Sequence, residues 1–149
     1  CNTVVLGGNT MCGLLNSAEL KCWGDNQGYA LGMGIAQNES IGDEPFEMGD
    51  YLISIEMPTG KTIINLWVST HVVVLFDDHT MTFWGDFSSW PTGSLGKEIN
   101  PTGSLKQHMG DALHIIHPEI ECRPVQVMLN RYSTIVLFDN GDVVGLGIN

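Results

Sequence analysis

The side chains best suited to covalent chemistry are four cysteines, Cys1, Cys12, Cys22 and Cys122. None of them forms a Cys-x-x-Cys pair, so the spacing is not that of a zinc ribbon or a thioredoxin-like redox motif. Cys12 and Cys22 flank a predicted β-hairpin. The sequence leaves the pairing of Cys1 and Cys122 open, because they could join each other, join further parts of a longer protein, or remain unpaired.

The hairpin around Cys12 and Cys22 places the two thiols within reach of each other. An antiparallel pairing that sets Leu15 opposite Glu19 also sets Cys12 directly opposite Cys22. Directly opposed residues in an antiparallel ladder can lie close enough for a disulfide. We therefore predict a Cys12–Cys22 disulfide, which would indicate maturation in an oxidising compartment. The alternative is two reduced thiols packed in a core.

One N-glycosylation sequon is present, Asn38-Glu39-Ser40. In a secreted eukaryotic protein with an exposed loop at this position, Asn38 would be an acceptor for a glycan. Chance occurrence of the short pattern is the alternative. Asn38 is therefore a candidate modification site under the interpretation that the protein is secreted.

Five carboxylates gather in one stretch of the chain: Glu39, Asp43, Glu44, Glu47 and Asp50. A calcium site needs several oxygen ligands that converge within roughly 2.3–2.6 Å of one point, and the spacing here is not that of an EF-hand. We interpret the stretch as a solvated acidic loop, with Asp50 and its counterpart Asp111 accepting backbone N–H groups in turns. We predict no metal site.

The histidines give no catalytic or metal-binding arrangement. His114 and His117 have a spacing that would suit a metal on a helix, but Pro118 and the strand-rich setting oppose a helix there. The sequence shows no Gly-x-Ser-x-Gly elbow and no nucleophilic cysteine near a His–Asp pair. We therefore expect no catalytic residue and no cofactor, and a protein that is not an enzyme.

The four tryptophans fall into two groups. Trp23 and Trp84 occupy the same position in an internal repeat, so core packing accounts for them. Trp67 and Trp90 do not recur. Because tryptophan is enriched at the energetic centres of protein interfaces, Trp67 and Trp90 are candidate anchors for a protein partner.

The charge balance excludes several classes of partner. Six Lys and Arg against 17 Asp and Glu give a formal net charge of −11. Such a balance repels polyanions, and no basic run offsets it locally, so we expect no nucleic acid partner and no anionic membrane partner. No apolar run approaches the roughly 20 residues that a membrane span needs.

An internal repeat of about 61 residues organises the chain. Trp23-Gly24-Asp25 recurs as Trp84-Gly85-Asp86, and Met48-Gly49-Asp50 recurs as Met109-Gly110-Asp111, each 61 positions later. A third copy follows at a shift of 62, where the run 74–78 reappears as 136–140. We assign the first copy to residues 1–61, the second to 62–122 and a truncated third to 123–149, and expect the chain to be an excerpt of a longer protein.

Each copy opens with an apolar run, a polar turn and a second apolar run. In the second copy, Val72–Phe76 precede the turn and Met81–Trp84 follow it. In the third copy, Asn140-Gly141 supply the residue pair that tight hairpin turns favour. The uninterrupted run Val72–Phe76 indicates a strand that is covered on both faces. No segment shows a capped helical periodicity, so we predict an all-β chain.

Strand-rich units of this length in tandem are typical of β-propeller blades. We therefore predict about two and a half propeller blades, an incomplete part of a propeller that cannot close alone. A β-solenoid and a two-sheet sandwich with accidental self-similarity are the alternatives. Sandwiches do not repeat at a fixed offset, and solenoid coils are usually shorter.

The repeat resembles that of the regulator of chromosome condensation family. The resemblance rests on the hairpin segments Met11–Leu15 and Leu20–Asn26, on Leu31-Gly32, on the small pair Gly7-Gly8 and on the loop Gly42–Asp50. It covers essentially the whole chain and is most evident in the first copy. In appearance the chain is closest to the secreted, bacterial and algal members of that family.

The resemblance implies a propeller that has seven blades when whole, but it does not imply one function, because fold does not fix function. The family includes a nucleotide exchange factor that binds chromatin, inhibitors of β-lactamases and surface proteins. Two departures stand out. Only His71 matches a histidine that is frequent before the hairpin, where Thr10 and Ser133 stand in the other copies, and Leu146 replaces the expected tryptophan.

These observations give three functional hypotheses. The first is a non-enzymatic propeller module, extracellular or at the cell surface, that acts as a structural scaffold or protein-binding part of a larger assembly. Its partners would be proteins, copies of itself or further blades of the same chain. The second is a nuclear or cytosolic regulator of a small GTPase or an inhibitor-type binding protein. The third, an enzyme, would need clustered polar residues at a central channel.

Overall fold

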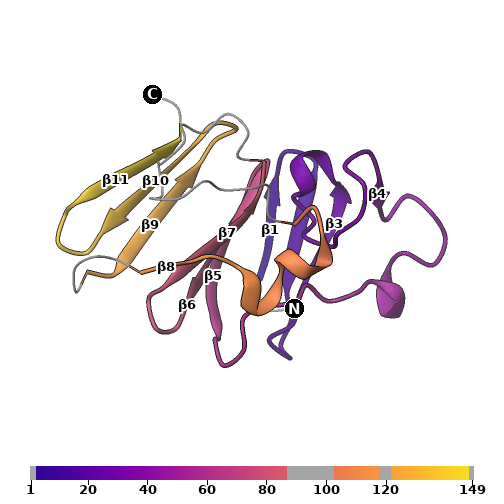
Figure 1. The fold of residues 1–149 in the computed structure, drawn as a ribbon, viewed down its shortest axis with the longest axis horizontal. Helices are drawn as coiled ribbons and strands as arrows, with labels where there is room; N and C mark the ends of the chain where they lie inside the picture. Colours follow the sequence, from indigo (N-terminus) through magenta and orange to yellow (C-terminus); the bar gives the residue numbers. More distant parts are fainter. Residues whose placement is uncertain (1–2, 87–102, 118–121, 148–149) are drawn as a thin grey trace.

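The computed structural model describes residues 3–86, 103–117 and 122–147, and it contains three antiparallel β-sheets that follow one another along the chain (Figure 1). The first sheet holds β1 (Thr3–Gly7), β2 (Thr10–Leu14), β3 (Leu20–Asp25) and β4 (Ser40–Ile41). The second holds β5 (Ile63–Val68), β6 (His71–Phe76), β7 (Met81–Gly85) and β8 (Ile115–Ile116). The third holds β9 (Pro124–Leu129), β10 (Ser133–Phe138) and β11 (Val143–Gly147).

The prediction of an all-β chain is confirmed. In the described residues the only helical segments are four three-residue 3₁₀ turns: η1 (Gln27–Tyr29), η2 (Gly49–Tyr51), η3 (Lys106–His108) and η4 (Gly110–Ala112). Each sheet is an up-and-down meander whose strands pair in chain order. Each sheet also draws its strands from one copy of the repeat, which explains why the same sequence pattern returns with a constant offset.

The register predicted for the hairpin of Cys12 and Cys22 is confirmed, and it recurs at the equivalent positions of the other two sheets. Cys12 pairs with Cys22 in the first sheet, and Val73 pairs with Phe83 in the second. In the third sheet Ile135 pairs with Gly145. The predicted double-covered strand is also confirmed, because all six residues of β6 are buried.

The sequence interpretation missed the first strand of each sheet. β1, β5 and β9 precede the three predicted hairpins, and they lie next to one another where adjacent sheets meet, β1 against β5 and β5 against β9. Gly7 at the end of β1 permits the closest of these contacts. A Cβ atom on Gly7 would lie 1.9 Å from the carbonyl oxygen of Val68 in β5, so no larger residue fits without moving the backbone.

Two apolar cores fill the spaces between the sheets. The first lies between the first and second sheets and includes Leu20, Leu31 and Trp84. The second lies between the second and third sheets and includes Val73, Phe83 and Val136. The middle sheet therefore contributes to a core on each face, and burial of apolar area on both faces is the main favourable term that stacks the sheets.

The structure contains a disulfide between Cys12 and Cys22, and both residues are fully buried. Cys122 is a free thiol. The equivalent pair of the second sheet, Val73 and Phe83, is also buried. In the first two sheets the position is therefore a packing site of the hairpin, and cysteine fills it in the first copy.

Candidate functional site

Side-chain hydrogen bonds join the neighbouring sheets in the described residues. The indole Nε1 of Trp84 in β7 donates a hydrogen bond of 2.9 Å to the carbonyl oxygen of Ala30, and Trp84 is fully buried. Gly32 lies against the same ring at a φ of 67°, and a Cβ atom there would lie 2.8 Å from Nε1. The turn of the first sheet that holds Ala30 and Gly32 therefore packs against the Trp84 indole of the second sheet.

A second contact joins the outer loops of these two sheets. The backbone N–H of Gly34 donates to the carbonyl oxygen of Gly103, and the N–H of Gly110 donates to that of Glu56. Asp111 accepts the backbone N–H of Thr59 at 2.6 Å and its hydroxyl at 3.0 Å. These two donors hold the pKa of Asp111 below its usual range.

Asp111 therefore accepts a backbone N–H, as the sequence predicted, but the partner is not in the same turn. Thr59 lies 52 residues away and belongs to the segment that leaves the first sheet. The aspartate thus joins two sheets instead of closing a local turn. The two members of the repeated Met-Gly-Asp motif also differ in burial, since Met109 is buried and Met48 is exposed.

A buried polar pair joins the second and third sheets. His71 Nε2 lies 2.8 Å from the hydroxyl of Thr134, and both residues are fully buried or nearly so. Burial lowers the pKa of His71 to about 4, against the opposing charge of Asp86. Nearby, the hydroxyl of Thr70 donates to the carbonyl oxygen of Arg131. His71 is therefore neutral at pH 7, and the contact is that of an uncharged imidazole with a hydroxyl.

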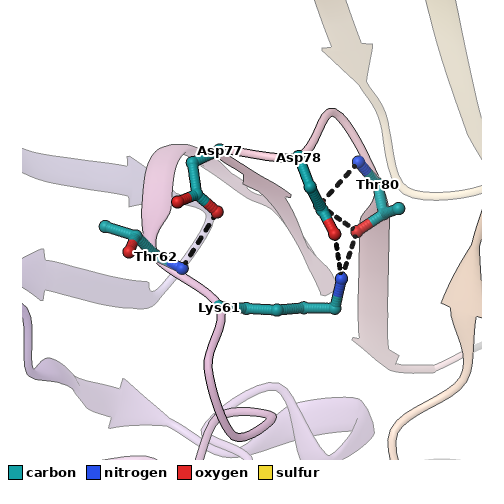
Figure 2. Close-up of polar contacts among 5 residues, drawn as sticks. All are labelled: Lys61, Thr62, Asp77, Asp78 and Thr80. Carbon is teal, nitrogen blue, oxygen red and sulfur yellow. Dashed lines mark hydrogen bonds and ion pairs between the residues drawn. The ribbon is translucent and has the colours of Figure 1, made fainter.

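A charged cluster anchors the turn between β6 and β7, as Figure 2 shows. The Lys61 ammonium forms an ion pair with the Asp78 carboxylate and donates to the hydroxyl of Thr80 at 2.9 Å. Lys61 and Thr80 together lower the pKa of Asp78 to about 2. Lys61 belongs to the segment that enters the second sheet, so the cluster ties that segment to the hairpin.

A neighbouring aspartate makes the same connection in two copies. Asp77 accepts the backbone N–H of Thr62, and Asp139 accepts that of Arg123 (Figure 2 shows the first pair). In each case the aspartate N–H donates back to the carbonyl oxygen of its partner. Because the geometry recurs where the side chain of the partner differs, these aspartates have a structural role.

The candidate residues from the sequence lie in different places. Trp67 is half-buried and packs against the core between the second and third sheets, which covers part of its indole. Trp90 lies outside the described residues. Asn38 is exposed and borders a shallow hollow that Asp25, Gln27 and Gln37 also line. Trp67 belongs to β5 of the second sheet and Asn38 to the segment before β4 of the first. The roles of all three residues in partner binding and glycosylation stay predictions.

The acidic loop is more ordered than the sequence suggested. The Glu47 carboxylate accepts the backbone N–H of Gly42 at 2.7 Å and that of Glu44 at 3.0 Å. These hydrogen bonds lower the pKa of Glu47. Among the residues that the structure describes, no three His, Cys, Asp or Glu side chains are grouped as metal ligands. No helix in the described ranges is long and apolar enough to cross a membrane.

The sequence interpretation also missed an aromatic pair in this loop. Phe46 and Tyr51 are both exposed, and their rings meet edge to face at a centroid distance of 5.2 Å. Comparison of the copies could have found them, because Gln107 and Ala112 stand at the equivalent positions of the second copy.

Comparisons with known proteins identify the fold through solved structures. No protein-family model matches the sequence, and no curated protein matches it either. Solved structures do match. Prp20p from Saccharomyces cerevisiae, studied for its binding to Gsp1p and histones, is 19% identical, with a TM-score of 0.64 over 98% of this chain. Yeast RCC1 (Prp20) bound to Kap60 is 16% identical, with a TM-score of 0.58 over 98% of this chain.

The fold is that of part of an RCC1-type β-propeller. Human WBSCR16 is similar as well, at 17% identity and a TM-score of 0.61 over 97% of this chain. The three sheets are therefore propeller blades, and the partial propeller predicted from the repeat is confirmed. The chain spans 31–32% of the length of these solved structures. The particular resemblance to secreted, bacterial and algal members remains a prediction.

Proposed function

We propose that this chain is a non-enzymatic propeller segment that serves as a structural and protein-binding part of a larger assembly. Further blades would cover the outer faces of the first and third blades. The observation that carries the proposal is the apolar outer face of the third blade. This face exposes the residues whose equivalents in the second blade are buried against a neighbour.

The comparison between the second and third blades is direct. Val73 of the second blade faces the third and is 3% exposed, while its equivalent Ile135 is 40% exposed. Met81 is also buried in that interface, while its equivalent Val143 is exposed. Met128, beside Ile135 in the ladder, completes an exposed apolar face. An apolar sheet face of this kind favours a covering element, because burial removes it from water.

The first blade shows the complementary feature. Trp84 of the second blade is buried and donates to Ala30 of the first. Trp23, its equivalent, is only half-buried. We infer that the Trp23 indole donates in the same way to the turn of a preceding blade. The solved neighbours are about three times as long as this chain, which supports further blades as the occupants over a second copy of the chain.

We further propose an extracellular or cell-surface location. The Cys12–Cys22 disulfide supports it, because structural disulfides form and persist in oxidising compartments. The exposed sequon at Asn38 is compatible with a glycan in the same setting.

The test is the intact mass of the protein from its source, with and without reduction and glycosidase treatment. We expect a mass far above 16.3 kDa, and a gain of about two daltons when the disulfide is reduced. A monomer of 16.3 kDa would contradict the larger propeller. A reduced Cys12–Cys22 pair in native material would remove the extracellular argument while leaving the propeller intact.

The similarity to Prp20p, studied for its binding to Gsp1p, favours one alternative: a regulator of a small GTPase. The matching measurement is the release of fluorescent GDP from a GTPase of the Gsp1p type, with and without this protein. Our proposal expects no acceleration. A rate increase that depends on protein concentration would favour the alternative.

A further inference from the structure

The loop that links β4 to the second blade carries an exposed group of residues that the scaffold role does not explain. It consists of Phe46, Tyr51, Asp43 and Glu44, and is called here the aromatic-acidic surface. Phe46 is 75% exposed and Tyr51 is 62% exposed. Figure 1 shows this loop extending past β4, away from the three sheets, to the short turn η2.

The second blade acts as an internal control for what the fold requires of this loop. Its loop, with η3 and η4, sits against the first blade, and there Met109 and Gly110 are buried. Their equivalents, Met48 and Gly49, are exposed and would be covered by a preceding blade in the same way.

The two aromatic residues behave differently. Gln107 and Ala112, the equivalents of Phe46 and Tyr51, are exposed even though the first blade covers the loop around them. A preceding blade would therefore leave Phe46 and Tyr51 exposed. The fold does not require aromatic residues at these positions, since glutamine and alanine stand there in the second blade. Two large rings left in water indicate an interaction surface.

The loop holds the two rings in place before any partner arrives. Glu47 accepts two backbone N–H groups of the loop, from Gly42 and Glu44. Phe46 lies at a φ of 68°, a conformation that non-glycine residues seldom adopt, and its ring rests edge to face against Tyr51. A preordered loop loses little conformational entropy on binding.

The charge around the rings indicates the chemistry of the partner. Between Cys22 and Gly60 the chain has seven Asp and Glu and no Lys, Arg or His. Asp43 and Glu44 are exposed and stand three and two positions before Phe46 in the same loop. Exposed rings flanked by carboxylates suit guanidinium or ammonium groups, which can stack on the ring face and pair with the carboxylates.

We propose that the aromatic-acidic surface binds an Arg- and Lys-rich segment of a partner protein. The inference adds a partner chemistry to the proposed protein-binding role. It rests on that role because it assumes that a protein partner exists. The segment would place a cationic side chain over the ring of Phe46 or Tyr51, with Asp43 and Glu44 neutralising its charge. Because both forces act at the surface, binding should weaken with added salt.

The experiment measures binding of a fluorescein-labelled, Arg-rich peptide of about eight residues to the full chain at about 0.15 M salt. A peptide with Glu in place of Arg is the ligand control. We expect the variant Phe46→Ser/Tyr51→Ser to weaken binding by about tenfold or more. We expect Asp43→Asn/Glu44→Gln to weaken it by about threefold to tenfold and to reduce the salt dependence.

Two matched variants separate this surface from the overall negative charge. Leu105→Ser removes an exposed apolar side chain from the equivalent loop of the second blade, and Asp142→Asn removes an exposed carboxylate from the third. Both should bind the peptide within about twofold of the parent chain. Unchanged melting curves would show that every variant folds.

Equal binding by the parent chain and Phe46→Ser/Tyr51→Ser would overturn the inference, and so would equal losses in the control variants. Neither result would affect the proposed propeller segment, which depends on the native mass. Conversely, a native mass of 16.3 kDa would remove the larger propeller without changing the peptide result.

Discussion

At the scale of single residues, His71 is the group whose charge state bears most directly on how the blades join. Its pKa is about 4 in the fold, against 6.5 for a free histidine. Between these two values the unfolded chain binds a proton that the folded chain does not. The contribution of His71 to the free energy of unfolding therefore has its full value above about pH 6.5. It decreases as the pH drops toward 4.

We predict that stability falls by up to about 3 kcal/mol across this window, because the imidazolium must be desolvated between two blades. Chemical denaturation at several values from about pH 7.5 to 4.5 would measure the slope. His71→Gln keeps a hydrogen-bonding group beside Thr134 and does not titrate, so its profile should be nearly flat. Parallel slopes for both proteins would show that other groups are responsible.

Asp78 is a contrasting case, although its pKa is also lowered. Lys61 and Thr80 stabilise its charged form and bring the pKa to about 2 from 3.8. The stability that this carboxylate contributes is present above about pH 4 and is lost only as the pH falls toward 2. The two groups titrate in separate ranges, so the window chosen for His71 excludes the contribution of Asp78.

At the scale of elements, the turn that holds Gly32 decides how the second blade docks on the first. Gly32 combines a positive φ with contact to the Trp84 ring, whereas Gly60 has a φ of 76° and no atom within 4 Å of an added Cβ. An alanine at Gly60 would meet backbone strain alone. An alanine at Gly32 would meet the same strain and would also displace the indole from Ala30.

We predict that Gly60→Ala costs about 1–2 kcal/mol in unfolding free energy, and that Gly32→Ala costs at least about 1–2 kcal/mol more. Urea denaturation of both variants measures the difference. The double variant Gly32→Ala/Trp84→Phe should lose less unfolding free energy than the sum of the losses in the two single variants, because both changes disturb one contact. Equal losses at Gly32 and Gly60 would contradict a docking role for this turn.

At the scale of the whole molecule, the open apolar face of the third blade is the feature with the widest consequence. A lysine in place of Ile135 should lower the unfolding free energy of the full chain by about 2–4 kcal/mol if a further blade covers the face. If the face is in water, the change should be within about 0.5 kcal/mol. Denaturant unfolding decides between these values, and Phe46→Ser provides an exposed apolar site as control.

The sequence by itself determined the repeat, the all-β class and the hairpin registers. These features depend on neighbouring residues, namely turn residues and apolar runs, so a constant offset was enough to align them. The opposition of Cys12 and Cys22 followed from the register of a single hairpin. The first strand of each blade is also rich in apolar β-forming residues, but it lies before the run–turn–run pattern from which the hairpins were predicted. These strands are Thr3–Gly7, Ile63–Val68 and Pro124–Leu129.

Only the tertiary structure decided which residues meet between blades. Trp84 and Ala30 are 54 residues apart, Asp111 and Thr59 are 52 apart, and His71 and Thr134 are 63 apart. A repeat predicts that blades are alike, but not which face meets which turn, because that depends on how the sheets stack. The stacking also decides which equivalent residues are buried: Met109 is covered by the first blade, whereas its equivalent Met48 is exposed.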